Sequence, residues 1–179
     1  MNADAIIGYI LDVREGSKYT NRADDLGGPT KWGVTAKTLG AFLGRDTPAT
    51  EAEVQALPRD QAFTILKKGY VTDPGFDLLD DGDLVALLVD SGVQFGPEEA
   101  VEWLQIALGG DAAGIKTDGN LGPKTLAAYS AFASKGALYM RVLGERIVKR
   151  GKVITRNPGQ AANAKGWFIR DAEFLGRPR

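Results

Sequence analysis

The sequence predicts a mostly helical α+β fold, and its length, its periodicity and one turn-rich stretch support that class. The chain has 179 residues, of which 44% are hydrophobic. That is enough for one real core but short for two independent domains. Apolar residues recur at helical spacing along most of the chain, whereas only residues 17–35 carry the turn signals of a hairpin. We therefore expect one compact globule with two lobes and a small hairpin.

The N-terminal segment predicts a helix followed by the hairpin. Asp4 is placed to cap an amphipathic helix, and Gly16 is its expected stop. Glu15 would then be the last residue of that helix. Residues 17–35 are polar and rich in glycine and aspartate, which is typical of a loop or a small hairpin.

The rest of the chain predicts a series of helices separated by glycine and proline. Thr35 can cap a short helix, and Thr50 with Glu53 forms a capping-box pattern ahead of the next one. Residues 83–95 are apolar around most of a helix, so we expect them to form the central buried helix. Further helices are expected to begin near Pro58, Pro97, Pro123 and Ala137, and a last helix carries Trp167 and Phe174.

The charge and the missing residue types exclude several classes of function. The 22 lysines and arginines balance 23 aspartates and glutamates, so no basic field attracts nucleic acid or an anionic membrane. The sequence holds no cysteine and no histidine, which removes thiol catalysis, Ser-His-Asp catalysis and the usual zinc sites. Glycoside hydrolysis remains as the large reaction class that runs on carboxylates alone. We therefore expect no cofactor and no metal site.

The first residues do not read as a signal peptide or as a membrane span. Asp4, Asp12 and Glu15 interrupt the apolar stretch, and no basic start precedes it. We expect the protein to accumulate in the cytoplasm without stable membrane insertion. Outside help would then be needed to reach a target beyond the membrane.

Residues 14–35 gather the side chains that glycoside hydrolysis needs. Glu15 at a helix end is followed by the adjacent Asp24 and Asp25 and by the hydroxyl of Thr30. A glycosidase needs a protonated acid on one side of the scissile oxygen and a carboxylate on the other. The C-terminal pole of a helix disfavours a negative charge on Glu15. The same residues also fit a structural interpretation, because loop aspartates usually cap backbone amides.

Motifs along nearly the whole chain are similar to those of one known family. They are EGSKYTN (15–21), DLGGPTKWGVT (25–35), KKGY (67–70), DSGVQFGP (90–97), DGNLGPKT (118–125) and KGWFIR (165–170). In order and spacing they resemble glycoside hydrolase family 108, which comprises phage endolysins and related bacterial muramidases. The resemblance implies a lysozyme-like fold, with a catalytic region over residues 1–86. A helical, peptidoglycan-binding-like region over residues 87–179 would pack into the same globule.

The resemblance also implies roles for individual residues. Glu15 corresponds to the family's general acid, and Asp25 to the aspartate of its motif. Asp24 and Thr30 keep the spacing from Glu15 that small phage lysozymes show, so Asp24 stays an alternative second carboxylate. Thr30 would position the attacking water.

Three further side chains are candidates for substrate binding. Trp32 and Tyr70 have flat faces that suit the apolar faces of sugar rings, although both also suit a core. Gln94 stands where the family motif usually has asparagine. All three are assigned to substrate binding because of their positions in the family-like motifs.

The resemblance implies an endolysin that hydrolyses the β-1,4 bond between N-acetylmuramic acid and N-acetylglucosamine in peptidoglycan. Its partner would be the glycan strand, and we expect a monomer that stays in the host cytoplasm until lysis. Dependence on a holin is left open. The alternatives are a lytic transglycosylase acting on the same bond, which can work without a second carboxylate, and a non-catalytic wall-binding protein.

Overall fold

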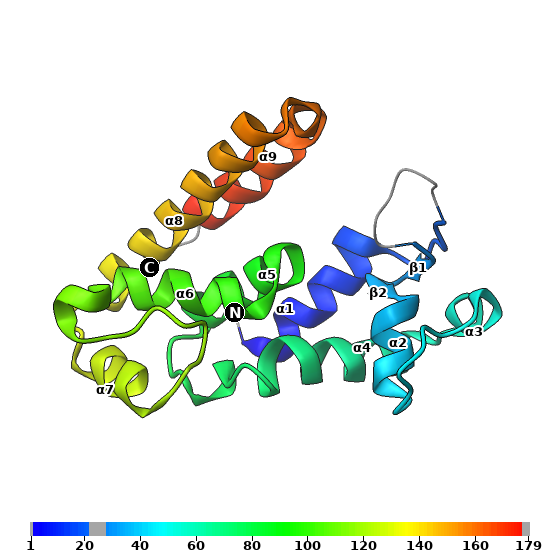
Figure 1. Cartoon of the computed structure of the whole chain (residues 1–179), viewed down its shortest axis with the longest axis horizontal. Helices are drawn as coiled ribbons and strands as arrows, with labels where there is room; N and C mark the ends of the chain where they lie inside the picture. Colours follow the sequence, from blue (N-terminus) through cyan, green and yellow to red (C-terminus); the bar gives the residue numbers. More distant parts are fainter. Residues whose placement is uncertain (1, 22–27, 177–179) are drawn as a thin grey trace. The chain divides into compact units, whose positions relative to one another are not determined.

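The computed structural model describes residues 2–21 and 28–176, and the chain divides into two compact units (Figure 1). The first unit comprises residues 1–78 and the second residues 79–179. The boundary that the sequence suggests, between residues 86 and 87, falls inside helix α5 (Gly82–Phe95), which belongs entirely to the second unit.

The first unit consists of helices and one small hairpin. Its elements are α1 (Ala3–Tyr9), the π-helix η1 (Ile10–Glu15), β1 (Thr30–Lys31), β2 (Val34–Thr35), α2 (Ala36–Phe42), α3 (Glu51–Ala56), α4 (Arg59–Lys67), the π-helix η2 (Lys68–Thr72) and the 3₁₀-helix η3 (Phe76–Leu78). The two strands pair antiparallel, with Thr30 opposite Thr35 and Lys31 opposite Val34. The predicted hairpin within a mostly helical fold is therefore confirmed.

Local capping signals start three of these helices. The side chain of Asn2 accepts a hydrogen bond from a first-turn backbone amide at 2.8 Å, so Asn2 caps α1. The prediction that Asp4 is this cap was wrong by two residues, and Asp4 instead lies in the first turn, where its charge still favours the helix. Thr35 caps α2, and Thr50 with Glu53 forms the predicted capping box of α3.

The continuous helix α1–η1 lies antiparallel to α4. Asp4 pairs with Lys67 at 2.7 Å, near the start of one helix and the end of the other, and Asp12 pairs with Arg59 at 2.6 Å. All four side chains are well exposed, so each pair contributes at most about 1 kcal/mol. Burial of apolar side chains from both helices contributes more. These are Ile6, Ile7, Ile10, Leu11, Ala62, Ile65 and Leu66.

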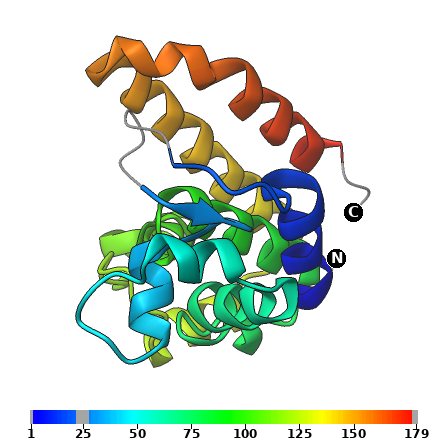
Figure 2. The ribbon, with the colours of Figure 1, turned by 90° about the vertical axis from the view of Figure 1, so that its right-hand side faces the viewer.

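The described residues of the second unit form helices joined by turns and loops, with no strand among them. Its elements are α5, α6 (Pro97–Ala107), the 3₁₀-helix η4 (Gly110–Ala113), α7 (Pro123–Ala131), α8 (Lys135–Arg156), the 3₁₀-helix η5 (Pro158–Asn163) and α9 (Ala164–Leu175). Helices α8 and α9 lie side by side and antiparallel, with η5 at their turn (Figures 1 and 2). No helix in the described part of the chain is long and apolar enough to cross a membrane.

Helix α5 is the buried helix that its sequence predicts, since every residue from Leu84 to Gly92 is buried. That run includes a charged residue, Asp90, which pairs with Arg146 of α8 at 2.7 Å and with Arg170 of α9 at 2.7 Å. Burial alone would raise the pKa of Asp90, but the charges and hydrogen bonds of Arg170 and Arg146 outweigh it and lower the pKa. The ion pairs thus fix the α8–α9 hairpin on α5.

Candidate active site

Glu15 is the last residue of η1, as the sequence predicts. The helix ends because the Gly16 amide donates to the Leu11 carbonyl at 2.8 Å and Gly16 then adopts a φ of 67°. This is an i→i−5 bond, so the final turn holds one residue more than an α-helical turn. The extra residue rotates Glu15 relative to an α-helical continuation, and the Glu15 side chain is exposed at the end of the helix.

The hairpin turn approaches Glu15 closely at a glycine. Trp32 and Gly33 are the two residues between the paired strands, and both have a positive φ, of 56° and 73°. A positive φ at both central residues defines a type I′ turn, whose twist matches the strands. A Cβ atom added at Gly33 would lie 2.8 Å from Cγ of Glu15. Only glycine therefore allows this turn to pack on Glu15 without displacing it.

Trp32 and Lys31, which precede Gly33, bond the hairpin to α3 and to the residue that follows it. The indole N–H of Trp32 donates to the Leu57 carbonyl at 3.2 Å, and Nζ of Lys31 donates to the Gln55 carbonyl at 2.6 Å. A residue other than glycine in the left-handed backbone region is strained by about 1–3 kcal/mol, and this conformation persists only where surrounding contacts hold it. The bond from the Trp32 indole to Leu57 is such a contact. Trp32 is half-buried, and its proposed stacking on sugar stays a prediction.

Thr30 forms a backbone bridge with Thr20. The Thr20 and Thr30 backbones exchange hydrogen bonds of 2.9 and 2.8 Å. The Thr30 hydroxyl donates to the Gly28 carbonyl at 2.9 Å, so its oxygen keeps lone pairs that can accept from a water. Asp24 and Asp25, the two candidates for the second carboxylate, lie outside the described residues, and their assignment stays a prediction.

Tyr70 lies on η2 and is electrostatically coupled to Glu15. Burial raises the pKa of Tyr70, and the negative charge of Glu15 raises it further. The two groups therefore lie within electrostatic range inside the first unit. Arg14, the residue before Glu15, places its guanidinium 5.1 Å from the centre of the Tyr9 ring.

Gln94 belongs to the second unit, where both ends of its amide have partners. Its nitrogen donates to the Asp90 carboxylate at 2.9 Å, and its oxygen accepts from Arg150 at 2.9 Å. These contacts give the side chain a structural role. Its predicted role in substrate binding stays a prediction.

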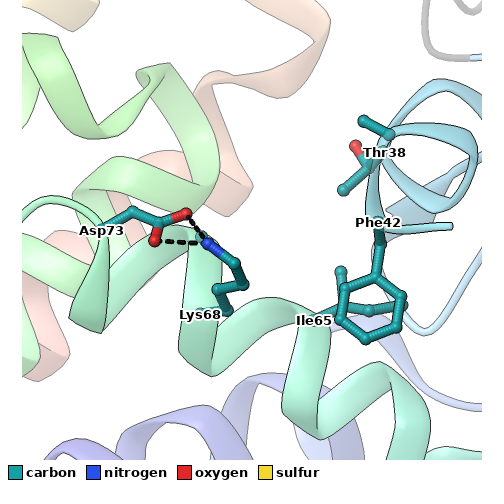
Figure 3. A pocket seen from close by; sticks show the side chains of 7 residues that line it. Thr38, Phe42, Ile65, Lys68 and Asp73 are labelled. Atoms are coloured by element: carbon teal, nitrogen blue, oxygen red, sulfur yellow. Dashed lines mark hydrogen bonds and ion pairs between the residues drawn. The ribbon is translucent and has the colours of Figure 1, made fainter. Parts of the chain in front are cut away.

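A pocket of about 300 Å³ opens in the first unit between α2 and η2. Its lining residues are Thr38, Ala41, Phe42, Ile65, Lys68, Gly69 and Asp73. Figure 3 shows Lys68 and Asp73 joined on one side, with Thr38 and Phe42 across from them. Among the described residues, no group of three or more acidic side chains is arranged to hold a metal ion.

The sequence motifs did not identify two features of the site, the contact of Gly33 with Glu15 and the pocket. The role of Gly33 has a local signal, a two-residue loop ending in glycine between the strand residues Lys31 and Val34. The pocket has no such signal, because Phe42 and Lys68 come from helices far apart in the sequence.

Comparisons with known proteins agree with this architecture. Residues 8–96 match the family described as Glycosyl hydrolase 108, and residues 99–172 match the Predicted Peptidoglycan domain. Nine chains of solved structures match, among them SagA of Brucella abortus. That match has a TM-score of 0.75 and 27% sequence identity, and it covers 95% of this chain and 89% of that chain. The comparison with curated proteins gave no match.

The fold and the matched domains define a glycoside hydrolase that degrades peptidoglycan. The lysozyme-like fold class expected from the sequence is confirmed by the structural match. The chain belongs to glycosyl hydrolase family 108 through residues 8–96 and carries a predicted peptidoglycan domain after them.

Proposed function

We propose that the protein is a lysozyme-type N-acetylmuramidase that uses Glu15 as its general acid. The bond cleaved is the β-1,4 linkage between N-acetylmuramic acid and N-acetylglucosamine. The contact between Gly33 and Glu15 carries this proposal, because it packs the hairpin turn directly on an exposed glutamate at a helix end. A helix end faced by a hairpin is an arrangement that can hold a glycan between an acid and a second group.

The proposed reaction needs only side chains of this chain and water. Glu15 gives its proton to the glycosidic oxygen as the bond from that oxygen to C1 breaks, so the leaving sugar departs with a hydroxyl. Water then attacks C1, and its proton passes to the second carboxylate, for which we propose Asp25, with Asp24 as the alternative. The Thr30 hydroxyl oxygen would accept a hydrogen bond from that water.

Analysis of the reaction products tests this proposal. Purified sacculi are digested with wild type and with Glu15→Gln, and the fragments are separated and weighed by mass spectrometry. We expect reducing muramic acid ends from wild type and a rate lower by about two to four orders of magnitude for the variant, since the amide cannot donate the proton. Thermal melts of both proteins establish that the variant is folded.

The same digest distinguishes the alternatives. Anhydro ends would identify a lytic transglycosylase, and reducing glucosamine ends a different bond. Binding to sacculi without any product would identify a wall-binding protein. The family resemblance supports an endolysin role, in which the enzyme lyses a bacterial host from within, as the setting that we propose for the activity.

A further inference from the structure

We propose that the pocket between α2 and η2 is a subsite for a neutral N-acetylated sugar of the glycan strand, with Phe42, Lys68 and Asp73 as its specificity-determining residues. The inference rests on the proposed function, since it gives the same substrate a second point of contact. It adds a binding site for N-acetylglucosamine that is separate from the residues that would break the bond.

Both walls of the pocket adjoin elements that reach Glu15. The η2 wall includes Gly69, and the next residue, Tyr70, senses the charge of Glu15. The α2 wall includes Thr38, whose hydroxyl lies 3.0 Å from that of Thr35, the last residue of the hairpin. The turn of that hairpin packs on Glu15, so the α2 wall connects through the hairpin to the proposed general acid. The η2 wall lies towards the start of α1, where Lys67 pairs with Asp4, so the pocket would take a sugar of the strand some way from the bond that is cleaved.

The charge of the pocket favours a neutral ligand. Nζ of Lys68 lies 2.6 and 2.8 Å from the two carboxylate oxygens of Asp73, so the two charges cancel locally. The ammonium keeps a further N–H to donate, the carboxylate keeps lone pairs to accept, and Thr38 adds a hydroxyl. Sugar hydroxyls can use all of these groups while the ion pair stays intact. The acidic peptide stem of peptidoglycan would instead meet the carboxylate of Asp73.

The opposite side of the pocket is apolar. The Phe42 side chain is 38% exposed, which is high for phenylalanine, whereas Ile65 beneath it is only 3% exposed. Figure 3 shows the Phe42 ring and Ile65 together, across the pocket from the ion pair. A pocket with polar groups on one side and an apolar wall on the other suits a pyranose, which has an apolar face and a methyl on its N-acetyl group.

The test measures binding of tri-N-acetylchitotriose, an oligomer of N-acetylglucosamine without peptide or lactyl groups. Affinity is measured by calorimetry, and NMR shifts of the backbone amides of Thr38 and Gly69 report the place of binding. The variants are Phe42→Ala and the double variant Lys68→Met with Asp73→Asn, which keeps the net charge. Lys67→Met is the matched control. Lys67 directly precedes Lys68 and forms an exposed ion pair with Asp4, but it does not line the pocket.

We expect shifts at both amides in wild type and about tenfold weaker binding in the double variant, as loss of one or two net hydrogen bonds predicts. Lys67→Met should bind as wild type does. On peptidoglycan fragments the double variant should raise KM and keep kcat, because Glu15 is untouched. Lys68 and Asp73 are exposed, so the double variant decides the matter even if Phe42→Ala fails to melt cooperatively.

Unchanged affinity in the double variant, or shifts confined to other amides, would overturn the subsite. Binding of a free stem peptide at these amides in place of the sugar would overturn it as well. Failure of the proposed function looks different: the sugar would bind at the pocket and lose affinity in the variants, yet sacculi would yield no muramic acid ends.

Discussion

Replacing Gly33 with alanine tests whether the contact between the hairpin and Glu15 matters for catalysis. At a φ of 73° an L residue pays roughly 1–2 kcal/mol, which should lower the stability of the first unit. The new Cβ would also lie 2.8 Å from Cγ of Glu15, so that side chain must move. Misplacing a catalytic group by about 1 Å can cost about 100-fold in rate, so we expect Gly33→Ala to lose about two orders of magnitude in lysis of sacculi.

Gly44→Ala is the matched control for this experiment. Gly44 has a φ of 74°, and a Cβ there would meet nothing within 4 Å, so the backbone penalty is the same and the collision is absent. Turbidity loss of purified sacculi gives the rate at equal protein, and thermal melts give the stability. Both variants should melt lower by similar amounts, but only Gly33→Ala should lose activity. If the two variants lyse sacculi at equal rates, the packing of the turn on Glu15 has no catalytic role.

Four further predictions concern charged groups and metal dependence. Asp90→Asn removes the carboxylate that pairs with Arg170 and leaves Arg146 with Asp171 alone, so urea unfolding of the second unit should show a loss of about 3–5 kcal/mol, and a loss under 1 kcal/mol would contradict the network. The pKa of Asp90 is lower in the folded protein than in the unfolded chain, where it is about 4. Its contribution to the free energy of unfolding is therefore complete above about pH 4 and is lost as the pH falls through the pKa of the folded state. Measuring the free energy of unfolding across acid pH checks this. Glu15→Gln should let Tyr70 ionise at lower pH, since it removes a charge that raises the Tyr70 pKa; phenolate absorbance checks this, with Tyr70→Phe to assign the signal. Lysis of sacculi should survive chelators because the proposed chemistry uses carboxylates alone, and complete loss restored by one divalent metal would argue against it.

The parts of the fold that the sequence predicts correctly depend on short-range interactions. Thr35 and the pair Thr50 and Glu53 cap their helices because each bond joins residues three apart. The buried α5 follows from apolar residues on nearly every side. At α1 both Asn2 and Asp4 are polar residues that could act as the N-cap. The local pattern favoured Asp4, whereas Asn2 caps the helix, which begins at Ala3. Asp4 instead pairs with Lys67 of α4 at 2.7 Å, a long-range contact that short patterns do not contain.

The parts that could not be predicted depend on contacts between distant segments. The sequence indicates that a helix ends at Glu15, but the π-helical turn that sets the direction of this side chain does not follow from residue spacing. The pocket needs α2 and η2 side by side, and its ion pair forms only because η2 continues α4 past Lys67. No local periodicity marks Phe42 as a residue that stays partly exposed.

Gln94 is a case in which a family motif has a structural explanation inside the second unit. Three guanidinium groups, of Arg146, Arg150 and Arg170, share two buried carboxylates, so positive charge is in excess. Burial and the nearby charge of Arg146 lower the pKa of Arg150 to about 10. The Gln94 carbonyl accepts from Arg150 while its amide nitrogen donates to Asp90, so Gln94 links the carboxylate of α5 to Arg150 of α8. Asparagine, one methylene shorter, could not span both contacts without a shift of the backbone. Glutamine therefore has the reach that this network requires, and a glycan that recruited Gln94 would have to compete with Arg150 for it.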